Sequence, residues 1–351
     1  MTDYLLSSYD YNLPEELIAD RPVADRHSSR LLVYDEATDS VTHSSYEFID
    51  QFLPENSTIV FNRSKVFPCR LIGRKPSGGE AEVFILSLIR DRDFYPAMIK
   101  ASGKRKVGDE FIFEGLKVKL EEISTKGFLV STNLSHHDFL NHLDKIGKIP
   151  IPPYIRGGES DEKDRETYQT VYAQEVGSVA VPTAGLHFSE ELLTKLKTKH
   201  SLATITLHVG AGTFAPVKTE NILEHSMHEE LYSIDEENLH VINQSRFRVA
   251  VGTTTLRTLE SCYKNGKIEF SKNGFQGTNI FLYPGRPVLS IDALVTNFHL
   301  PKSSLIMLVS ALIGREKTLE LYDIGIQNKY RFYSYGDGML ILRDPKKIFK
   351  A

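Results

Sequence analysis

The sequence predicts an α/β domain that is interrupted, at about residues 65–150, by a small all-β domain. Residues 203–209, 248–251 and 292–295 are strand-like runs, each leading into a polar loop and then a helical pattern. Residues 66–132 instead hold several short β-rich runs with glycine turns between them. The chain has 351 residues, which is more than one average domain needs.

The first sixty residues mix a helical segment with short strands. A helix over residues 13–18 is expected because Pro14 suits the first turn of a helix. Short β runs follow at 31–34 and 58–61.

The β-rich segment predicts a small barrel or sandwich. Its turns contain Gly78, Gly79, Gly103, Gly108, Gly115 and Gly127, and its expected strands include 81–89, 111–113, 116–120 and 128–131.

A helix and an extended linker are expected after the β-rich segment. Ser135 is placed to cap the helix, with Asp138 three residues later completing an S-x-x-D start signal. Residues 149–154 are rich in proline and predict an extended linker back into the first domain.

The second half consists of βα units. Residues 203–209 alternate between apolar and polar side chains, as a half-buried strand does. Residues 248–251 run into a Gly-Thr-Thr-Thr loop and then a helix. Residues 292–295 run into 296–299, after which Pro301 is expected to open a helix that ends at Gly314.

The composition is that of an ordinary globular protein, with 41% hydrophobic and 25% charged residues. Cys69 and Cys262 lie far apart and in no metal-binding spacing, which favours a reducing compartment. The N-terminus lacks the pattern of a secretory signal, and the longest apolar run, 305–313, is too short to span a bilayer. We therefore expect a cytoplasmic protein without membrane association.

Basic residues form two local clusters although the net charge is −4. One interpretation is a face that binds anions or phosphates, and the other is a pair of solvated loops. The first cluster comprises Arg63, Lys65, Arg70, Arg74 and Lys75, and the second Lys100, Lys104, Arg105 and Lys106.

Several familiar motifs are incomplete. Residues 210–215 match G-x-G-x-x-A after a strand, but Pro216 follows and no helix opens until about Glu220, so a dinucleotide fold is not predicted. The two glycines allow either close approach of a ligand or a simple tight turn. His228 begins an H-E-x-x-H pattern that ends in Tyr232, and no third ligand is evident, so no metal site is predicted. A P-loop and a G-x-S-x-G elbow are both absent from the sequence.

Polar loops recur where the predicted strands end. In α/β folds such loops converge on a ligand site at the carboxyl ends of the strands. For any single histidine in such a loop, a structural role is an alternative to a catalytic one. Three histidines in equivalent loops favour a site that moves protons. The loops are 182–188 with His187, 208–213 with His208, 252–255 with Arg257, and 297–302 with His299 and Lys302.

The chain resembles a family along nearly its whole length. The matching stretches include 149–155, 168–173, 177–180, 182–188, 207–210, 251–254, 296–302 and 330–337, together with Tyr11, Leu13, Pro14, Arg26, Phe61, Asn62, Met227, His228 and Glu230. These residues are similar to those of the S-adenosylmethionine:tRNA ribosyltransferase-isomerases of queuosine biosynthesis. Two departures are Arg63-Ser64-Lys65, where the family has an Asp-Thr-Arg run, and Arg286, where it has an aromatic residue.

The resemblance implies a barrel-like α/β domain, residues 1–64 and 151–351, with an inserted antiparallel β-barrel domain, residues 65–150. It implies transfer and isomerisation of the ribosyl part of S-adenosylmethionine onto the aminomethyl group of preQ1 at the tRNA wobble position. Epoxyqueuosine-tRNA, adenine and methionine would be the products. S-adenosylmethionine is then a co-substrate, with no metal or other cofactor, and the protein is expected to act as a monomer on tRNA.

The proton transfers of this reaction are assigned to His187, His208 or His299 as a hypothesis. An S-adenosylmethionine-dependent RNA methyltransferase and a non-catalytic RNA-binding protein remain alternatives. The residues expected to bind S-adenosylmethionine are Thr183, Gly185, Gly210, Gly212, Thr213, Thr253, Thr254, Arg257 and Lys302.

Overall fold

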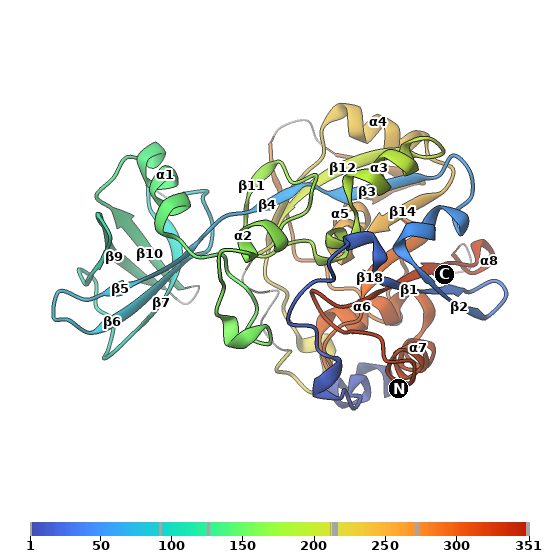
Figure 1. The fold of residues 1–351 in the computed structure, drawn as a ribbon, viewed down its shortest axis with the longest axis horizontal. Coiled ribbons are helices and arrows are strands. Elements are labelled where there is room, and N and C mark those ends of the chain that lie inside the picture. The colour runs from blue at the N-terminus through green and yellow to red at the C-terminus, as the bar shows by residue number, and fades with distance from the viewer. Residues whose placement is uncertain are drawn as a thin grey trace.

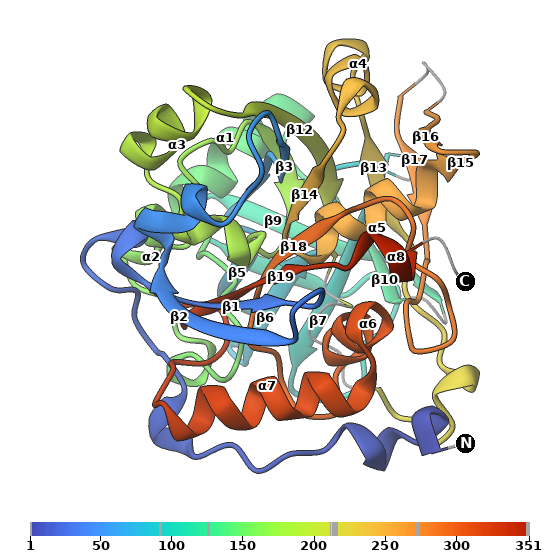
Figure 2. The same cartoon turned by 90° about the vertical axis from the view of Figure 1, so that its right-hand side faces the viewer.

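The computed structural model describes residues 2–90, 93–124, 127–210, 212, 217–270 and 274–348. Two bodies lie next to each other along the long axis of the molecule, a β-barrel at the left of Figure 1 and a larger α/β body at the right. Figure 2 looks at the α/β body end-on, with the barrel behind it. The predicted fold, an α/β domain with an inserted antiparallel barrel, is confirmed.

The α/β body is built on a nine-stranded mixed sheet with the order β17-β13-β12-β3-β14-β18-β19-β1-β2. The central strands β12, β3, β14 and β18 are parallel, whereas β19 is antiparallel to β18 and parallel to β1. The strands are β1 Arg30–Asp35, β2 Ser40–Ser45, β3 Thr58–Asn62, β12 Ser201–His208, β13 Glu230–Ser233, β14 Arg248–Val251, β17 Gln276–Thr278, β18 Ala293–Asn297 and β19 Gly338–Leu342.

Helices cover both faces of this sheet, so its central strands are buried on both sides. In β3, Val60 packs with side chains of α4, α5 and α6, while Ile59 and Phe61 pack on the other face with α3. This explains why β3 is buried throughout and why its middle residues, Ile59, Val60 and Phe61, are all apolar instead of alternating. The helices are α3 Glu190–Lys197, α4 Glu236–Gln244, α5 Thr253–Cys262, α6 Ser304–Ile313, α7 Arg315–Gln327 and α8 Pro345–Ile348.

The inserted barrel is closed and antiparallel, with the order β10-β7-β6-β5-β8-β9. Its interior holds alternate residues of each strand, as Phe111 and Phe113 of β8 illustrate. Helix α1, His136–Ile146, packs on it and is capped by Ser135, which accepts from the Asp138 backbone N–H as predicted. The barrel strands are β5 Arg70–Arg74, β6 Glu80–Ile85, β7 Tyr95–Ala101, β8 Glu110–Phe113, β9 Leu116–Ser124 and β10 Gly127–Thr132.

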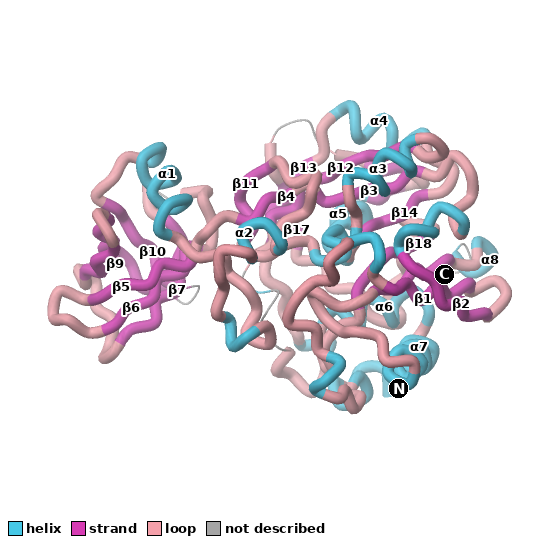
Figure 3. Tube along the Cα trace, viewed as in Figure 1, coloured by secondary structure: helices cyan, strands magenta, loops and turns pink. Residues whose placement is uncertain are grey.

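Two segments connect the bodies, as the tube in Figure 3 makes easy to follow. On the way into the barrel, β4, Ser64–Val66, pairs with β11, Glu175–Ser178. On the way out, Arg70 of β5 forms ion pairs with Glu82 at 2.8 Å and with Glu159 at 3.0 Å, which ties the barrel to the return segment. The return segment also contains the short helix α2, Asp164–Thr167.

Several predicted elements differ in extent. The expected helix at 13–18 is a single 3-10 turn, η3, Glu15–Leu17. The strand expected at 81–89 ends at Ile85. Helix α6 begins at Ser304 instead of Pro301, because the side chain of Ser303 accepts from the Ile306 N–H and sets the first turn there.

Cys69 and Cys262 are both buried free thiols. In the part of the chain that the structure describes, no helix is long and apolar enough to cross a membrane.

Candidate functional site

Two adjoining cavities lie where strands β14 and β18 end and helices α5 and α6 begin. One has a volume of about 580 Å³ and the other about 260 Å³. They share a wall made of Thr253 and Thr254 from α5 and Ser304 and Leu305 from α6. Each of these residues is in the first turn of its helix, so two helix N-termini border both cavities.

The larger cavity is mainly apolar and aromatic. Tyr154 and Tyr333 meet in its wall with ring centroids 4.7 Å apart, and the Tyr154 hydroxyl is 2.8 Å from the Ser334 hydroxyl. Tyr168 and Phe298 also line it. Its volume is in the range of small-molecule sites, and flat aromatic walls suit a flat heterocycle.

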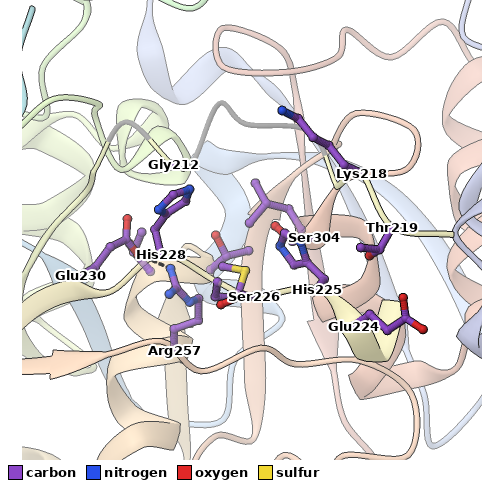
Figure 4. Close-up of a pocket in the computed structure, with 14 residues that line it drawn as sticks. Gly212, Lys218, Thr219, Glu224, His225, Ser226, His228, Glu230, Arg257 and Ser304 are labelled. Atoms are coloured by element: carbon purple, nitrogen blue, oxygen red, sulfur yellow. Dashed lines mark hydrogen bonds and ion pairs between the residues drawn. The ribbon is translucent and has the colours of Figure 1, made fainter. Parts of the chain in front are cut away.

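The smaller cavity is charged, and Figure 4 displays its lining. Its cationic groups are Lys218 and Arg257, and its carboxylates are Glu224 and Glu230. His225, Ser226, Met227 and His228 contribute further side chains from the segment before β13. The pKa of His225 is lowered by burial and, to a lesser extent, by the neighbouring His228.

Asn297, the last residue of β18, organises the larger cavity. Its amide nitrogen donates to the Tyr333 carbonyl at 3.1 Å, which identifies that side as the NH₂ group. The same nitrogen therefore donates to His187 Nε2 at 3.1 Å, and the amide oxygen accepts from the Thr183 hydroxyl at 2.9 Å. Thr183 lines the cavity as expected.

His187 is enclosed and its Nε2 lone pair is occupied. The ring stacks on Tyr46 with centroids 4.3 Å apart. Burial, helped by the charges of Arg331 and Arg26, lowers the pKa of His187 to about 3. His187 is therefore neutral and lies outside both cavity linings, where it fixes the Asn297 amide.

His299 is the predicted histidine that lines the larger cavity. The ring Nε2 is 2.8 Å from the Thr296 hydroxyl. The His299 backbone N–H donates to the Tyr322 hydroxyl at 3.0 Å, and its backbone carbonyl accepts from the Tyr11 hydroxyl. Burial lowers the pKa of His299 to about 3, so the ring is neutral near pH 7. A neutral imidazole at a cavity wall is able to accept a proton, although so low a pKa makes it a weak base.

His208 lies outside the lining of both cavities. It is on the opposite side of β12 from the apolar residues, with its ring 4.9 Å from that of Phe275 and packed against Gly177. Burial lowers the pKa of His208, and Glu175 partly opposes this. The three histidines of equivalent strand-end loops thus do not converge on one point.

The predicted threonine and cationic residues do border the site. Thr253 and Thr254 line both cavities, Arg257 lines the smaller one and Lys302 the larger one. Arg257 is buried and paired with Glu230, whereas Lys302 is about half-exposed and 2.6 Å from Asp10.

The predicted glycines have different surroundings. Gly212 lines the smaller cavity, and the Gly210 N–H donates to Glu230 at 2.9 Å. Gly185 lines neither cavity, and a Cβ there would lie 1.9 Å from the Tyr172 hydroxyl, so close packing alone accounts for this glycine. Thr213, also predicted to bind S-adenosylmethionine, lies outside the described residues.

The structure brings the end of the first basic cluster, Arg74 and Lys75, next to the second cluster at one end of the barrel. The Lys75 ammonium donates to the Ser102 carbonyl at 3.1 Å, which places the β5–β6 turn beside the loop after β7. Arg74, Lys104 and Lys106 are exposed there. Arg63 and Arg70 are instead partly buried in ion pairs, the former with Asp235 at 3.0 Å, so the first cluster is not one continuous surface.

Sequence reasoning missed Asn297, Tyr154, Tyr333, His225 and Glu230 as individual site residues. The sequence offered a signal for two of them: Asn297 is in a predicted strand-end loop, and His225 is three residues before His228. The tyrosines carry no local signal, because they reach the cavity only through long-range packing. Among the described residues, no group of three or more His, Cys, Asp or Glu side chains is placed to hold a metal ion.

Comparisons with known proteins agree on one family. A family model described as "Queuosine biosynthesis protein" matches residues 6–341. A curated Campylobacter jejuni protein named S-adenosylmethionine:tRNA ribosyltransferase-isomerase is 45% identical over 350 residues, covering 97% of this chain and 99% of the relative. A Sulfurimonas denitrificans protein of the same name is 43% identical with the same coverage. The solved structure of the Thermotoga maritima S-adenosylmethionine tRNA ribosyltransferase is similar with a TM-score of 0.53 and 30% identity, covering 96% of this chain and all of that chain.

Proposed function

The chain belongs to the queuosine biosynthesis protein family, and we propose that it is an S-adenosylmethionine:tRNA ribosyltransferase-isomerase. It transfers and isomerises the ribosyl part of S-adenosylmethionine onto the aminomethyl group of preQ1 at the wobble position of a tRNA. Epoxyqueuosine-tRNA, adenine and methionine are the products. We expect it to act as a cytoplasmic monomer without a metal or redox cofactor, with residues 65–150 as its inserted domain.

The observation that supports this function best is the pair of adjoining cavities, of which the larger is aromatic and the smaller is charged. The reaction needs S-adenosylmethionine and a modified base to meet, and the two cavities share Thr253, Thr254, Ser304 and Leu305. A wobble base turned out of its stack can enter the aromatic cavity, since enzymes that modify bases take them out of the helix. Hydroxyls and backbone N–H groups at the shared wall are suited to stabilise negative charge on ribose oxygens.

The chemistry begins at the sulfonium of S-adenosylmethionine, which acidifies the adjacent 5′ methylene. A base removes a proton there, the ylide that forms opens the ribose, and adenine leaves. The primary amine of preQ1 must attack while neutral, which a proton acceptor favours.

The residue assignments follow from which side chains face the cavities. His299 is the proton acceptor in the larger cavity, and His187 is a positioning residue that acts through Asn297. His208 has the weakest claim of the three because it lines neither cavity. Thr183, Thr253, Thr254 and Gly212, which line the cavities, are retained as contacts to S-adenosylmethionine. Gly210, which lines neither cavity, and Thr213, which lies outside the described residues, are retained from the sequence alone.

An adenine-release assay tests this function. The full chain is incubated with S-adenosylmethionine and tRNA that carries preQ1, and the small-molecule products are separated. Adenine together with methionine is expected. S-adenosylhomocysteine as the product would identify a methyltransferase instead, and RNA binding without any turnover would identify a binding protein.

The same assay ranks the histidines. We expect His299→Ala to lower kcat by about 10²–10⁴-fold, the range of general acid–base catalysis, and His208→Ala to change it least. His187→Ala is expected to act mainly through loss of stability and site geometry, because its ring touches Asn297 and not the cavity. Near-normal turnover of His299→Ala would rule out its role.

A further inference from the structure

Arg257 is a buried cation whose hydrogen bonds are incomplete. Its side chain is only 6% exposed. Nη1 pairs with Glu230 and Nε donates to the Ile280 carbonyl at 3.3 Å, but Nη2 has no hydrogen-bond partner among the described residues. A buried guanidinium N–H without an acceptor is unfavourable, so this nitrogen is suited to a ligand that brings one.

Arg257 lies near the N-terminus of α5, which is a second group that attracts an anion. It is four residues after Thr253, the first residue of α5, and on the same face of the helix. Helical side chains lean toward the N-terminus of their helix. No side chain of the described residues caps α5, which begins after Gly252 at a φ of 89°. Arg257 and the first two residues of α5, Thr253 and Thr254, thus line the same charged cavity, in which Figure 4 draws the Arg257 side chain.

The charges around the smaller cavity favour a zwitterion over a phosphate. Its wall carries two cations, Lys218 and Arg257, and two carboxylates, Glu224 and Glu230. Glu230 already neutralises much of the Arg257 charge, and it also accepts from the Gly210 N–H. A doubly charged phosphate would meet no net positive charge, whereas an amino acid offers a carboxylate and an ammonium to groups of both signs.

We propose that the smaller cavity binds the methionyl end of S-adenosylmethionine, with its α-carboxylate held by Arg257 Nη2 and the N-terminus of α5. This rests on the proposed function, since it takes S-adenosylmethionine as the co-substrate. The sulfonium and ribose then lie at the shared wall of Thr253, Thr254, Ser304 and Leu305, facing the aromatic cavity. Methionine leaves from the charged side, away from the base that receives the ribosyl group.

The test measures equilibrium binding of unreactive ligands to the full chain, so that turnover is not needed. S-adenosylhomocysteine and its decarboxylated analogue are compared by calorimetry on the wild type. We expect the analogue to bind roughly 10- to 100-fold more weakly, the usual effect of a lost charged hydrogen bond. Arg257→Met should weaken the binding of S-adenosylhomocysteine by a similar factor and leave the binding of the analogue nearly unchanged. The variant should then bind the two ligands with similar affinity.

Arg257→Lys is the second variant, because it keeps a cation beside Glu230 but cannot place a nitrogen where Nη2 lies. It should remove most of the preference for the carboxylate even if Arg257→Met does not fold. Arg343→Met is the matched control, a buried arginine that lines neither cavity and donates to the carbonyls of Val288 and Ile291. It should retain the wild-type preference.

Two results would overturn the proposal. One is a wild type that binds both ligands equally, and the other is an Arg257→Lys variant with the full preference. Inorganic phosphate that displaces S-adenosylhomocysteine better than methionine does would also overturn it, by indicating an RNA-phosphate site. None of these results depends on adenine release, so a wild type that releases no adenine would refute the proposed function separately.

Discussion

At the scale of single residues, Asn297 determines what its neighbours can do. Its amide joins Thr183 and His187, the two ends of the 3-10 turn 183–187, to the Tyr333 carbonyl from a distant segment of the chain. Because the Tyr333 carbonyl can only accept, the direction of each bond is fixed and His187 Nε2 must be an acceptor. A protonated His187 would lose that bond, so the network requires the neutral ring.

The buried histidines predict a loss of stability in mild acid. Burial lowers the pKa of His187 and of His299 from 6.5 to about 3, so the unfolded chain binds more protons between those values. The free energy of unfolding should therefore be fully retained above about pH 6.5 and fall below it, by up to about 1.4 kcal/mol per pH unit for each histidine. Urea unfolding at a series of pH values measures this slope.

The variant His187→Gln separates the contribution of this histidine to the pH dependence of stability from the contribution of the carboxylates. It should reduce the slope between about pH 6 and 4.5 by up to about 1.4 kcal/mol per pH unit. His137→Gln, at an exposed position of α1, should leave the slope as it is. A His187→Gln slope equal to that of the wild type would contradict the assigned neutral state.

The sequence alone could place His208 and His299 at the ends of the sheet strands β12 and β18, whereas His187 lies in a 3-10 turn, and it could not rank the three. Their loops look alike, each following an apolar run. What separates them is which residues surround the ring, such as Tyr46 for His187 and Phe275 for His208. Those partners come from distant parts of the chain, and no spacing in the sequence reports them.

At the scale of elements, the 3-10 helix η7, Thr183–His187, joins the cavity to the core. Thr183 at its start faces the larger cavity, while Gly185 in its middle is packed against Tyr172. The glycine allows the backbone to approach the tyrosine hydroxyl, which is buried and has no hydrogen-bond partner among the described residues. Any side chain at this position would push the helix away from the strands that define the site.

Gly185→Ala is therefore expected to destabilise the protein by overpacking, at a cost of about 1–3 kcal/mol. The added Cβ would lie 1.9 Å from the Tyr172 hydroxyl and 2.9 Å from Thr170 Cγ2. Tyr172→Phe alone should be close to neutral, because the hydroxyl it removes makes no hydrogen bond with the described residues. The double variant should lose less stability than the two single variants together, as measured by urea unfolding.

Gly210→Ala serves as the control in this cycle, since the nearest atom to its added Cβ is Glu230 Cγ at 3.9 Å. Its effect on stability should add to that of Tyr172→Phe. If the stability effects of Gly185→Ala and Tyr172→Phe also add, the two residues do not compete for space.

Element boundaries were less predictable than element types. The strand β14 lies at 248–251 as predicted, but α5 begins at Thr253, so most of the Gly-Thr-Thr-Thr segment expected as a loop is the first turn of the helix. The loop expected at 296–299 partly belongs to β18, because pairing with β19 continues to Asn297. Such pairing joins residues some forty positions apart, so a local pattern cannot determine where the strand stops.

At the scale of the whole molecule, the two bodies were predictable to different degrees. The barrel pairs neighbours in sequence, such as β5 with β6 and β8 with β9, so short runs and glycine turns were enough to predict it. The large sheet depends on distant pairings. Strand β1 near the N-terminus joins β19 near the C-terminus, an arrangement that the sequence alone did not predict.

The far end of the barrel predicts how RNA binding responds to salt. Arg74, Lys104 and Lys106 are exposed there, on turns that point away from the α/β body in Figure 1. If they contact tRNA phosphates, reversing all three charges should weaken tRNA binding and reduce the slope of log K against log salt by about 2 to 3, since each neutralised phosphate contributes about 0.7–0.9. Binding of S-adenosylhomocysteine should not change.

Reversing Lys197, Lys264 and Lys346, which are exposed on the α/β body, alters the net charge equally and is the control. A control with the same loss of slope would mean that overall charge, and not the barrel end, attracts the RNA.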